Sequence, residues 1–391
     1  MAGLNPYNQY YLELANNQQN QLNLLAPPQK PVNDKLPGPD ESGSVVDLDF
    51  FEASRPTDPN SDPGIEHGDL TKATMRGEGF TGHVSRRSVP HGVDDDIAAG
   101  ARIAMSQASN KSDYFNALDS SIKSDQTGFL KDVTKSLQQV DRAGTKDSVV
   151  NISQGLGKSR EVSNLMMAAM QDPDMLQNTT SAFGVKKDDF LSSDKKVSGK
   201  ARATVMQGLV DRVNRDTDGN PEIAKAKSQY DQTVQNLADK RVFVAVAAGN
   251  EGTSVQDMVG SKKAAETVQT PDDYYTNPLS NSNTDTIGSV EGSRQNPTQM
   301  TAQAYSNPSP GVTQYANGRE YTRNEQGTSF ATPRYSSVES SLLKLYPNAS
   351  HDEIRQMISG DSLSDDVPNQ AGARMLDETK ARDFLHSGAL N

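Results

Sequence analysis

Apolar residues along the chain gather in short runs. The clearest run covers residues 242–248 and ends in a glycine turn at Gly249–Asn250, and similar short runs lie at 44–51, 148–153 and 285–290. Short apolar runs bounded by turn residues predict strands buried on both faces, as in parallel sheets covered by helices.

Between these runs, apolar residues recur three or four positions apart. This spacing predicts helices within 94–141, in most of 158–240, and in a long segment that begins near Ser329. Strands that alternate with helices indicate an α/β fold, with a mostly parallel central sheet and helices on both faces.

Both ends of the chain have a different composition. Residues 1–43 are rich in Asn, Gln and Pro and predict a flexible lead, and residues 361–391 predict a polar, loosely attached extension. The first residues have neither a basic segment nor an apolar one of the kind that secretory signals carry. We therefore expect a cytoplasmic protein or one exported by a non-classical route.

Composition and charge narrow the function classes. The formal net charge is −12, without a cluster of Lys and Arg, so we expect neither nucleic acid nor a membrane as a partner. The chain of 391 residues contains no cysteine, which excludes disulfides, thiolate zinc sites and a cysteine nucleophile. No run of 18 apolar residues is present.

The sharpest chemical motif is Gly-Thr-Ser-Phe-Ala-Thr-Pro at 327–333. It places Ser329 at the start of a predicted helix, where the helix N-terminus favours developing negative charge. Gly327 just before it frees the backbone for a close approach. An ordinary Ser/Thr helix cap is the alternative interpretation of this segment.

This motif resembles the nucleophile segment of the subtilases, the subtilisin-like serine peptidases. The resemblance covers roughly residues 44–360 and implies a subtilisin-like three-layer fold in that range. It further implies a serine endopeptidase that acts on protein or peptide substrates, with Ser329 as the nucleophile. The resemblance implies that catalysis requires no cofactor. Structural calcium is common in the family, but no loop in this sequence can be assigned as its binding site.

Two further segments resemble the same family in the same order. Ala247–Gly252 is similar to the subtilase segment whose asparagine donates a hydrogen bond to the oxyanion, which implies that role for Asn250. Residues 150–155 resemble the strand that pairs with the substrate, which implies substrate contacts for Ser153, Gln154 and Gly155.

The general base has two candidates among the five histidines. His67 is followed by Gly68 and resembles the start of the family's base-bearing helix, although the residues after it depart from the usual pattern. His91 is followed by Gly92 but lies between a proline and an acidic run. We favour His67.

The carboxylate that orients this base should end the first strand, where Asp47 and Asp49 share one face. Choosing Asp49 would bury Asp47 without an obvious partner, and a buried unpaired carboxylate is costly. Asp47 is therefore favoured and Asp49 is the alternative. The resulting order Asp, His, Asn, Ser is that of the subtilisins.

The segment 158–240 is far longer than its counterpart in the resembling family. We expect a mainly helical insertion beside the substrate cleft, acting as a lid, a partner-docking element, an inhibitor of the site or a solvated decoration. The residues around Asp47 and His67 depart from the motifs of the resembling family. An alternative hypothesis is therefore a catalytically impaired binding or structural protein that kept the fold.

Overall fold

The structure is a computed structural model that describes residues 32–49, 67–89, 95–292, 300–308, 311–320, 325–368, 370 and 372–387. A sheet of nine strands forms the centre of this described part, in the order β2-β1-β3-β4-β5-β7-β9-β8 with β6 beside β5. Neighbouring strands are parallel except for the pairs β5–β6 and β8–β9, so the sheet is mostly parallel, as predicted. The strands are β1 (Val45–Asp49), β2 (Val84–Ser88), β3 (Ser148–Ile152), β4 (Val242–Ala247), β5 (Thr284–Gly292), β6 (Met300–Ala302), β7 (Val312–Asn317), β8 (Ser364–Asp366) and β9 (Arg374–Leu376).

Helices cover both faces of this sheet. Val45 of β1 points into an apolar cluster shared with α2, α12, α13 and α14, while the next residue, Val46, points into a cluster shared with α4 and α9. This alternation confirms the three-layer α/β fold. The helices are α2 (His67–Gly77), α3 (Asp95–Ser106), α4 (Lys111–Arg142), α5 (Lys158–Gln171), α6 (Pro173–Ala182), α7 (Lys187–Phe190), α8 (Lys195–Gly219), α9 (Pro221–Ala238), α10 (Ser254–Val259), α11 (Lys262–Ala265), α12 (Thr328–Leu345), α13 (His351–Ser359) and α14 (Glu378–Ser387).

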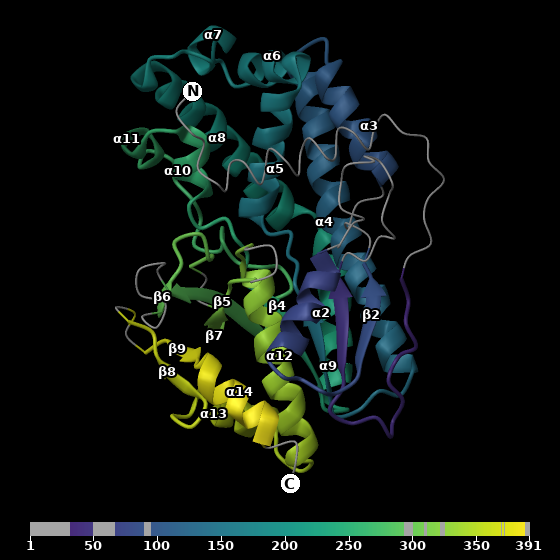
Figure 1. Cartoon of the computed structure of the whole chain (residues 1–391). Coiled ribbons are helices and arrows are strands. Elements are labelled where there is room, and N and C mark those ends of the chain that lie inside the picture. Colours follow the sequence, from purple (N-terminus) through teal and green to yellow (C-terminus); the bar gives the residue numbers. More distant parts are fainter. Residues whose placement is uncertain are drawn as a thin grey trace, which may run out of the picture.

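A further apolar core lies outside the sheet and is built mainly from helices, with Val268 and Tyr274 added from the loop after α11. Met105, Phe190 and Met206 are among its buried residues. We call the helices around it the helical lobe: α3, residues 111–122 of α4, α5 to α8, and α10. Figure 1 shows these helices gathered at one end of the molecule, beyond the sheet.

The segment 158–240 is helical, as expected, but its helices have two different neighbours. Helices α5 to α8 belong to the helical lobe, whereas α9 packs on the sheet through residues such as Tyr230 and Val234. The limits expected for the peptidase domain and its insertion stay predictions.

The described parts of the terminal segments, residues 32–43 and most of 361–387, pack on the rest of the fold. In the described part of the lead, Asn33 pairs with Arg87 of β2 and Asp34 forms an ion pair with Arg86. At the other end, β9 pairs with β7, and Leu376 and Leu385 are buried against α12. This packing differs from the loose C-terminal extension expected above. Within the described ranges, no helix has the length and apolar character that a membrane crossing requires.

Candidate active site

Ser329 is the second residue of α12, at the helix N-terminus, and its side chain is nearly buried. Gly327 precedes the helix. A Cβ atom at position 327 would lie 3.0 Å from Ser329 Oγ and 3.2 Å from the side-chain nitrogen of Asn250, Nδ2. A side chain at this position would therefore crowd both groups, and the hydroxyl and the amide nitrogen border the same point.

His67 opens α2 and faces the hydroxyl. Its Nε2 atom lies 2.9 Å from Ser329 Oγ, and its ring contacts Phe330 with a centroid distance of 5.3 Å. The preference for His67 thus agrees with its position next to Ser329. The alternative, His91, lies outside the described residues.

The carboxylate beside this imidazole is Asp49, the last residue of β1. Both of its oxygens lie 2.9 Å from His67 Nδ1, and its side chain is fully buried. The preference for Asp47 as the orienting carboxylate is therefore wrong, and the alternative Asp49 holds that position.

Asp47 is also fully buried, on the same face of β1, but two partners compensate its burial. Thr71 Oγ1 of α2 donates to it at 2.8 Å and Asn151 Nδ2 of β3 donates at 2.7 Å. Asp47 therefore has partners that its neighbours in the sequence do not indicate, because both donors come from other elements of the fold.

The two aspartates and the histidine influence one another electrostatically. Burial disfavours the imidazolium, but the carboxylates around it, above all Asp49 and to a smaller extent Glu325 and Asp47, outweigh burial and raise the pKa of His67 above its usual value. Burial and the neighbouring charge of Asp49 together raise the pKa of Asp47 to about 7. The two carboxyl groups therefore have different partners: Asp49 faces the imidazole of His67, and Asp47 faces the neutral donors Thr71 and Asn151.

Asn250 follows β4 after a glycine turn. Its Oδ1 accepts hydrogen bonds from Thr328 N at 2.9 Å and Thr328 Oγ1 at 3.1 Å. Because the oxygen is held in this way, the Nδ2 group is free to face Ser329. Gly249 has a φ of +106°, in the left-handed region, and a Cβ there would lie 2.2 Å from Asn307 Nδ2.

The segment Ser153–Gly155 follows β3 at the same edge of the sheet. Ser153 Oγ receives a hydrogen bond from Asn151, and the Gln154 side chain donates to Asp49 Oδ1 at 3.1 Å. A Cβ on Gly155 would lie 2.4 Å from the side-chain nitrogen of Asn277. Substrate binding by this segment stays a prediction, but Gln154 has an additional contact that the sequence did not indicate.

Several supporting residues were not identified from the sequence. Thr328 lies in the motif at 327–333 and Glu251 in Ala247–Gly252, so these motifs indicate both positions but not the contacts that the two residues make. Asn277 donates to Gln154 O at 3.1 Å and to Ala247 O at 2.6 Å, joining the two segments beside the site. Its surroundings in the sequence carry no pattern that predicts this role.

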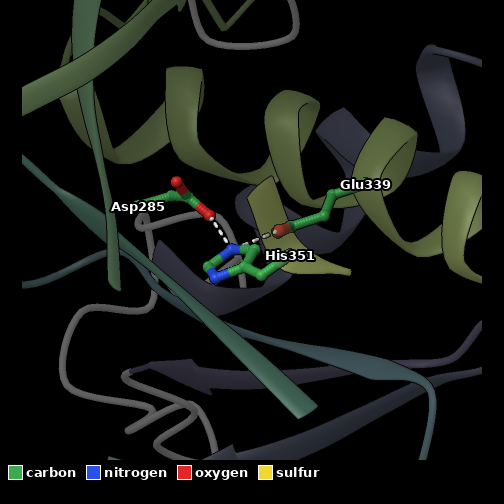
Figure 2. A group of neighbouring side chains, drawn as sticks. All are labelled: Asp285, Glu339 and His351. Carbon is green, nitrogen blue, oxygen red and sulfur yellow. Dashed lines mark hydrogen bonds and ion pairs between the residues drawn. The ribbon is translucent and has the colours of Figure 1, made fainter. Parts of the chain in front are cut away.

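One group in the described part of the chain has the composition of a metal site: Asp285, Glu339 and His351. Figure 2 shows the imidazole between the two carboxylates, with His351 Nε2 2.7 Å from Asp285 and 3.3 Å from Glu339. Arg355 Nε occupies the other oxygen of Asp285 at 2.6 Å. The imidazole and the guanidinium face the two carboxylates, so the group forms a buried ion-pair cluster.

Chemically, the arrangement at Ser329 joins a hydroxyl, an imidazole and a carboxylate in one chain of hydrogen bonds. Such a chain can transfer the hydroxyl proton to the imidazole and stabilise the resulting imidazolium. An amide donor and a helix N-terminus beside the hydroxyl can stabilise negative charge on a reacting carbonyl oxygen.

Comparisons with solved structures found similar proteins, among them three at low identity. Among solved structures, the chain resembles one described as "Crystal Structure of a Lanthipeptide Protease", with 13% identity, a TM-score of 0.41, and coverage of 89% of this chain and 88% of that one. It also resembles a cold adapted subtilisin-like serine proteinase, with 12% identity, a TM-score of 0.36, and coverage of 92% and 97%. A third is the MycP3 protease from the type VII (ESX-3) secretion system, with 13% identity, a TM-score of 0.30, and coverage of 89% and 80%.

No curated protein matches the sequence. The model of the subtilase family, by contrast, matches residues 146–374, which is more than half of the 391 residues and contains both Asn250 and Ser329. This chain belongs to the subtilase family.

Proposed function

We propose that the protein is a serine endopeptidase that uses Ser329, His67 and Asp49 as its catalytic triad. The observation that carries the proposal is the imidazole of His67, which lies 2.9 Å from both the Ser329 hydroxyl and the Asp49 carboxylate. Subtilases are typically serine peptidases, so peptides are the expected substrate class.

In this proposal each group has one task. His67 takes the proton of Ser329 as the hydroxyl attacks the scissile carbonyl, and later returns it to the leaving amine. Asp49 holds the imidazole in the tautomer that accepts this proton at Nε2. The Asn250 amide and the Ser329 backbone N–H bind the oxyanion that forms between these steps.

The segment Ser153–Gly155 supports binding of an extended peptide. It continues β3 beyond the hydrogen-bonded part of the sheet, where a peptide can add as a further strand. Gly155 keeps this segment without a side chain next to Asn277. An extended peptide bound there would place a carbonyl near Ser329.

The alternative, a binding or structural protein with impaired chemistry, has less support. Loss of catalysis removes the reason to keep the donors and acceptors aligned, yet the chain from Asp49 through His67 to Ser329 has hydrogen-bond distances at each step. Docking of a partner on the helical lobe stays a prediction.

Labelling with a fluorophosphonate probe tests the proposal directly, because the probe reacts with activated serine hydroxyls. We expect the folded wild-type protein to be labelled at Ser329 and to cleave members of a quenched-fluorescent peptide library. Ser329→Ala should abolish both signals, whereas Ser341→Ala, on the same helix but bonded only within it, should keep them. A folded wild-type protein that neither labels nor cleaves would contradict the proposal.

A further inference from the structure

Two segments of the candidate site lead directly into the helical lobe. The segment 153–155 is followed by α5, and the turn that carries Asn250 is followed by α10. Val255 and Val259 of α10 are buried in the apolar core of the lobe. The turn that carries the proposed oxyanion donor therefore connects β4 of the sheet to a helix of the lobe.

An ion pair between Arg160 and Glu251 joins α5 to the turn that carries Asn250. Arg160 of α5 places its Nη1 atom 3.2 Å from Glu251 Oε1, and the Glu251 side chain is 6% exposed. The other carboxylate oxygen, Oε2, accepts from the backbone N–H of Asn250 at 2.9 Å. One buried carboxylate thus joins a lobe helix to the peptide group that carries the proposed oxyanion donor.

The same turn is held at further points by Asn307. Its Oδ1 accepts from Glu251 N at 2.8 Å, and its Nδ2 donates to Glu251 Oε2 and to Ala248 O, both at 3.1 Å. These neutral contacts satisfy hydrogen bonds, but the cation that the structure places against the Glu251 carboxylate is Arg160.

We infer that Arg160 is a positioning residue: through Glu251 it holds the Asn250 turn, so that the helical lobe sets the geometry of the oxyanion site. The inference rests on the proposed function, because it assigns the lobe a part in the same reaction. Neither Arg160 nor Glu251 touches the reacting atoms. They act through the backbone of Asn250.

Breaking the pair between Arg160 and Glu251 should disturb the turn that carries Asn250. A buried carboxylate that loses its cation is strongly destabilised, so the turn would shift to bring Glu251 into contact with water. The Asn250 amide would then leave its place beside Ser329. Because oxyanion contacts form only in the transition state, the loss should lower kcat and leave KM nearly unchanged.

The test compares three variants with the wild type. Arg160→Gln removes the charge, and Arg160→Lys keeps it. Arg212→Gln is the matched control, since Arg212 pairs with Asp119 at 2.8 Å inside the lobe and has no contact to the site. For each protein, kcat and KM are measured with one cleaved library peptide, and hydrogen–deuterium exchange is followed in the segment 247–254.

We expect Arg160→Gln to lower kcat about tenfold, with KM within about twofold of the wild type, an effect smaller than the loss of a whole oxyanion donor. Exchange in 247–254 should become faster in Arg160→Gln, be largely restored in Arg160→Lys, and stay unchanged in Arg212→Gln. Wild-type kcat and unchanged exchange in Arg160→Gln would overturn the inference. If the wild type cleaves nothing, the proposed function fails, and exchange alone decides the link: faster exchange supports it and unchanged exchange overturns it.

Discussion

Thr71 donates a 2.8 Å hydrogen bond to Asp47, one helical turn beyond His67 on the same helix. The carboxyl group of Asp47 also receives a hydrogen bond from Asn151, whose side-chain oxygen accepts one from Ser336 of α12. All four side chains are fully buried. This network joins β1, the helix of His67, the strand before Ser153 and the helix of Ser329 just beneath the candidate site.

The two aspartates should have unequal effects on catalysis. Asp49→Asn removes the charge that stabilises the imidazolium and allows the wrong tautomer of His67, so we expect kcat to fall by about 10⁴-fold. Asp47→Asn leaves the contact between Asp49 and His67 in place, so kcat should fall by less than about tenfold. Steady-state kinetics on one peptide substrate measure both. Equal losses in the two variants would argue against Asp49 as the orienting group.

Asp47 should make the stability of the protein depend on pH. Its pKa is about 7 in the folded protein against 3.8 for an unburied aspartate. The stabilisation from its proton is fully present below pH 3.8 and is lost as the pH rises through 7. The Asp47→Asn variant lacks this loss, so its free energy of unfolding relative to the wild type should rise between pH 4 and 7, by on the order of 3 kcal/mol.

Urea unfolding at a series of pH values measures this difference. Asp34→Asn is a suitable control, because Asp34 pairs with Arg86 and its pKa is lowered rather than raised. For that variant, the relative free energy of unfolding should stay nearly constant from pH 4 to 7, because a pKa lowered from 3.8 confines the effect of Asp34 to more acidic pH. A flat difference between Asp47→Asn and the wild type would show that Asp47 is ionised in the folded protein at all of these pH values.

Gly327 should matter for activity more than for folding. Its φ of 171° is extended backbone that any residue adopts, so Gly327→Ala causes no backbone strain. The added methyl group would, however, lie 3.0 Å from Ser329 Oγ and 3.2 Å from Asn250 Nδ2, where the oxyanion must bind. We expect kcat/KM to fall at least about tenfold while the melting temperature stays within a few degrees.

A second glycine provides the comparison for this variant. Gly184 has open space around its Cα, but its φ of +72° is unfavourable for alanine. Gly184→Ala should therefore lower the melting temperature without affecting kcat/KM, the reverse of the effect at position 327. Wild-type activity in Gly327→Ala would mean that the oxyanion binds elsewhere.

The ion-pair cluster around His351 should weaken the protein at alkaline pH. Burial lowers the pKa of His351, but the carboxylates of Asp285 and Glu339 outweigh it and raise the value to about 9. The stabilisation from this proton is fully present below the unfolded value of 6.5 and is lost as the pH rises through 9. Relative to His351→Gln, the wild type should lose at most about 3 kcal/mol of unfolding free energy over that interval.

Denaturant unfolding from pH 6 to 9.5 tests this expectation. The pKa of Glu339 is raised to about 7 by burial and by the charge of Asp285, so its proton is also lost in the lower part of the same range. Glu339→Gln separates the two groups, because the His351 transition should remain in that variant but move below pH 9, since one of the two carboxylates that raise the pKa of His351 is removed. A His351→Gln variant with the same pH dependence as the wild type would contradict the assignment to His351.

Much of the site could be predicted because its parts are local. Ser329 lies at the start of a helix, and Asn250 lies in the turn that follows a strand. Each belongs to a contiguous motif, and the neighbouring residues of that motif give the backbone its local conformation. The apolar run at 242–248 likewise predicted β4, because a strand buried on both faces needs apolar residues at every position. For such features the chemistry and the backbone are encoded in the same few residues.

The choice between Asp47 and Asp49 could not be made in this way. Both residues lie on one face of β1, so periodicity treats them as equivalent. What separates them is the position of α2, which brings His67 to the end of the strand and Thr71 one turn below it. That position results from the packing of helices on the sheet, which involves residues far apart in the chain.

The helical lobe shows the same division between local and tertiary information. The spacing of apolar residues in 158–240 determined that these segments are helices with one apolar face each. The spacing did not determine against which residues each apolar face packs. In the structure, α9 packs on the sheet, whereas α5 to α8 pack in a separate core. The sequence by itself determined the elements and the reactive side chains, because short-range periodicity and motifs encode them. Only the tertiary structure decided which polar groups became partners, because burial and hydrogen bonding depend on segments that meet in space.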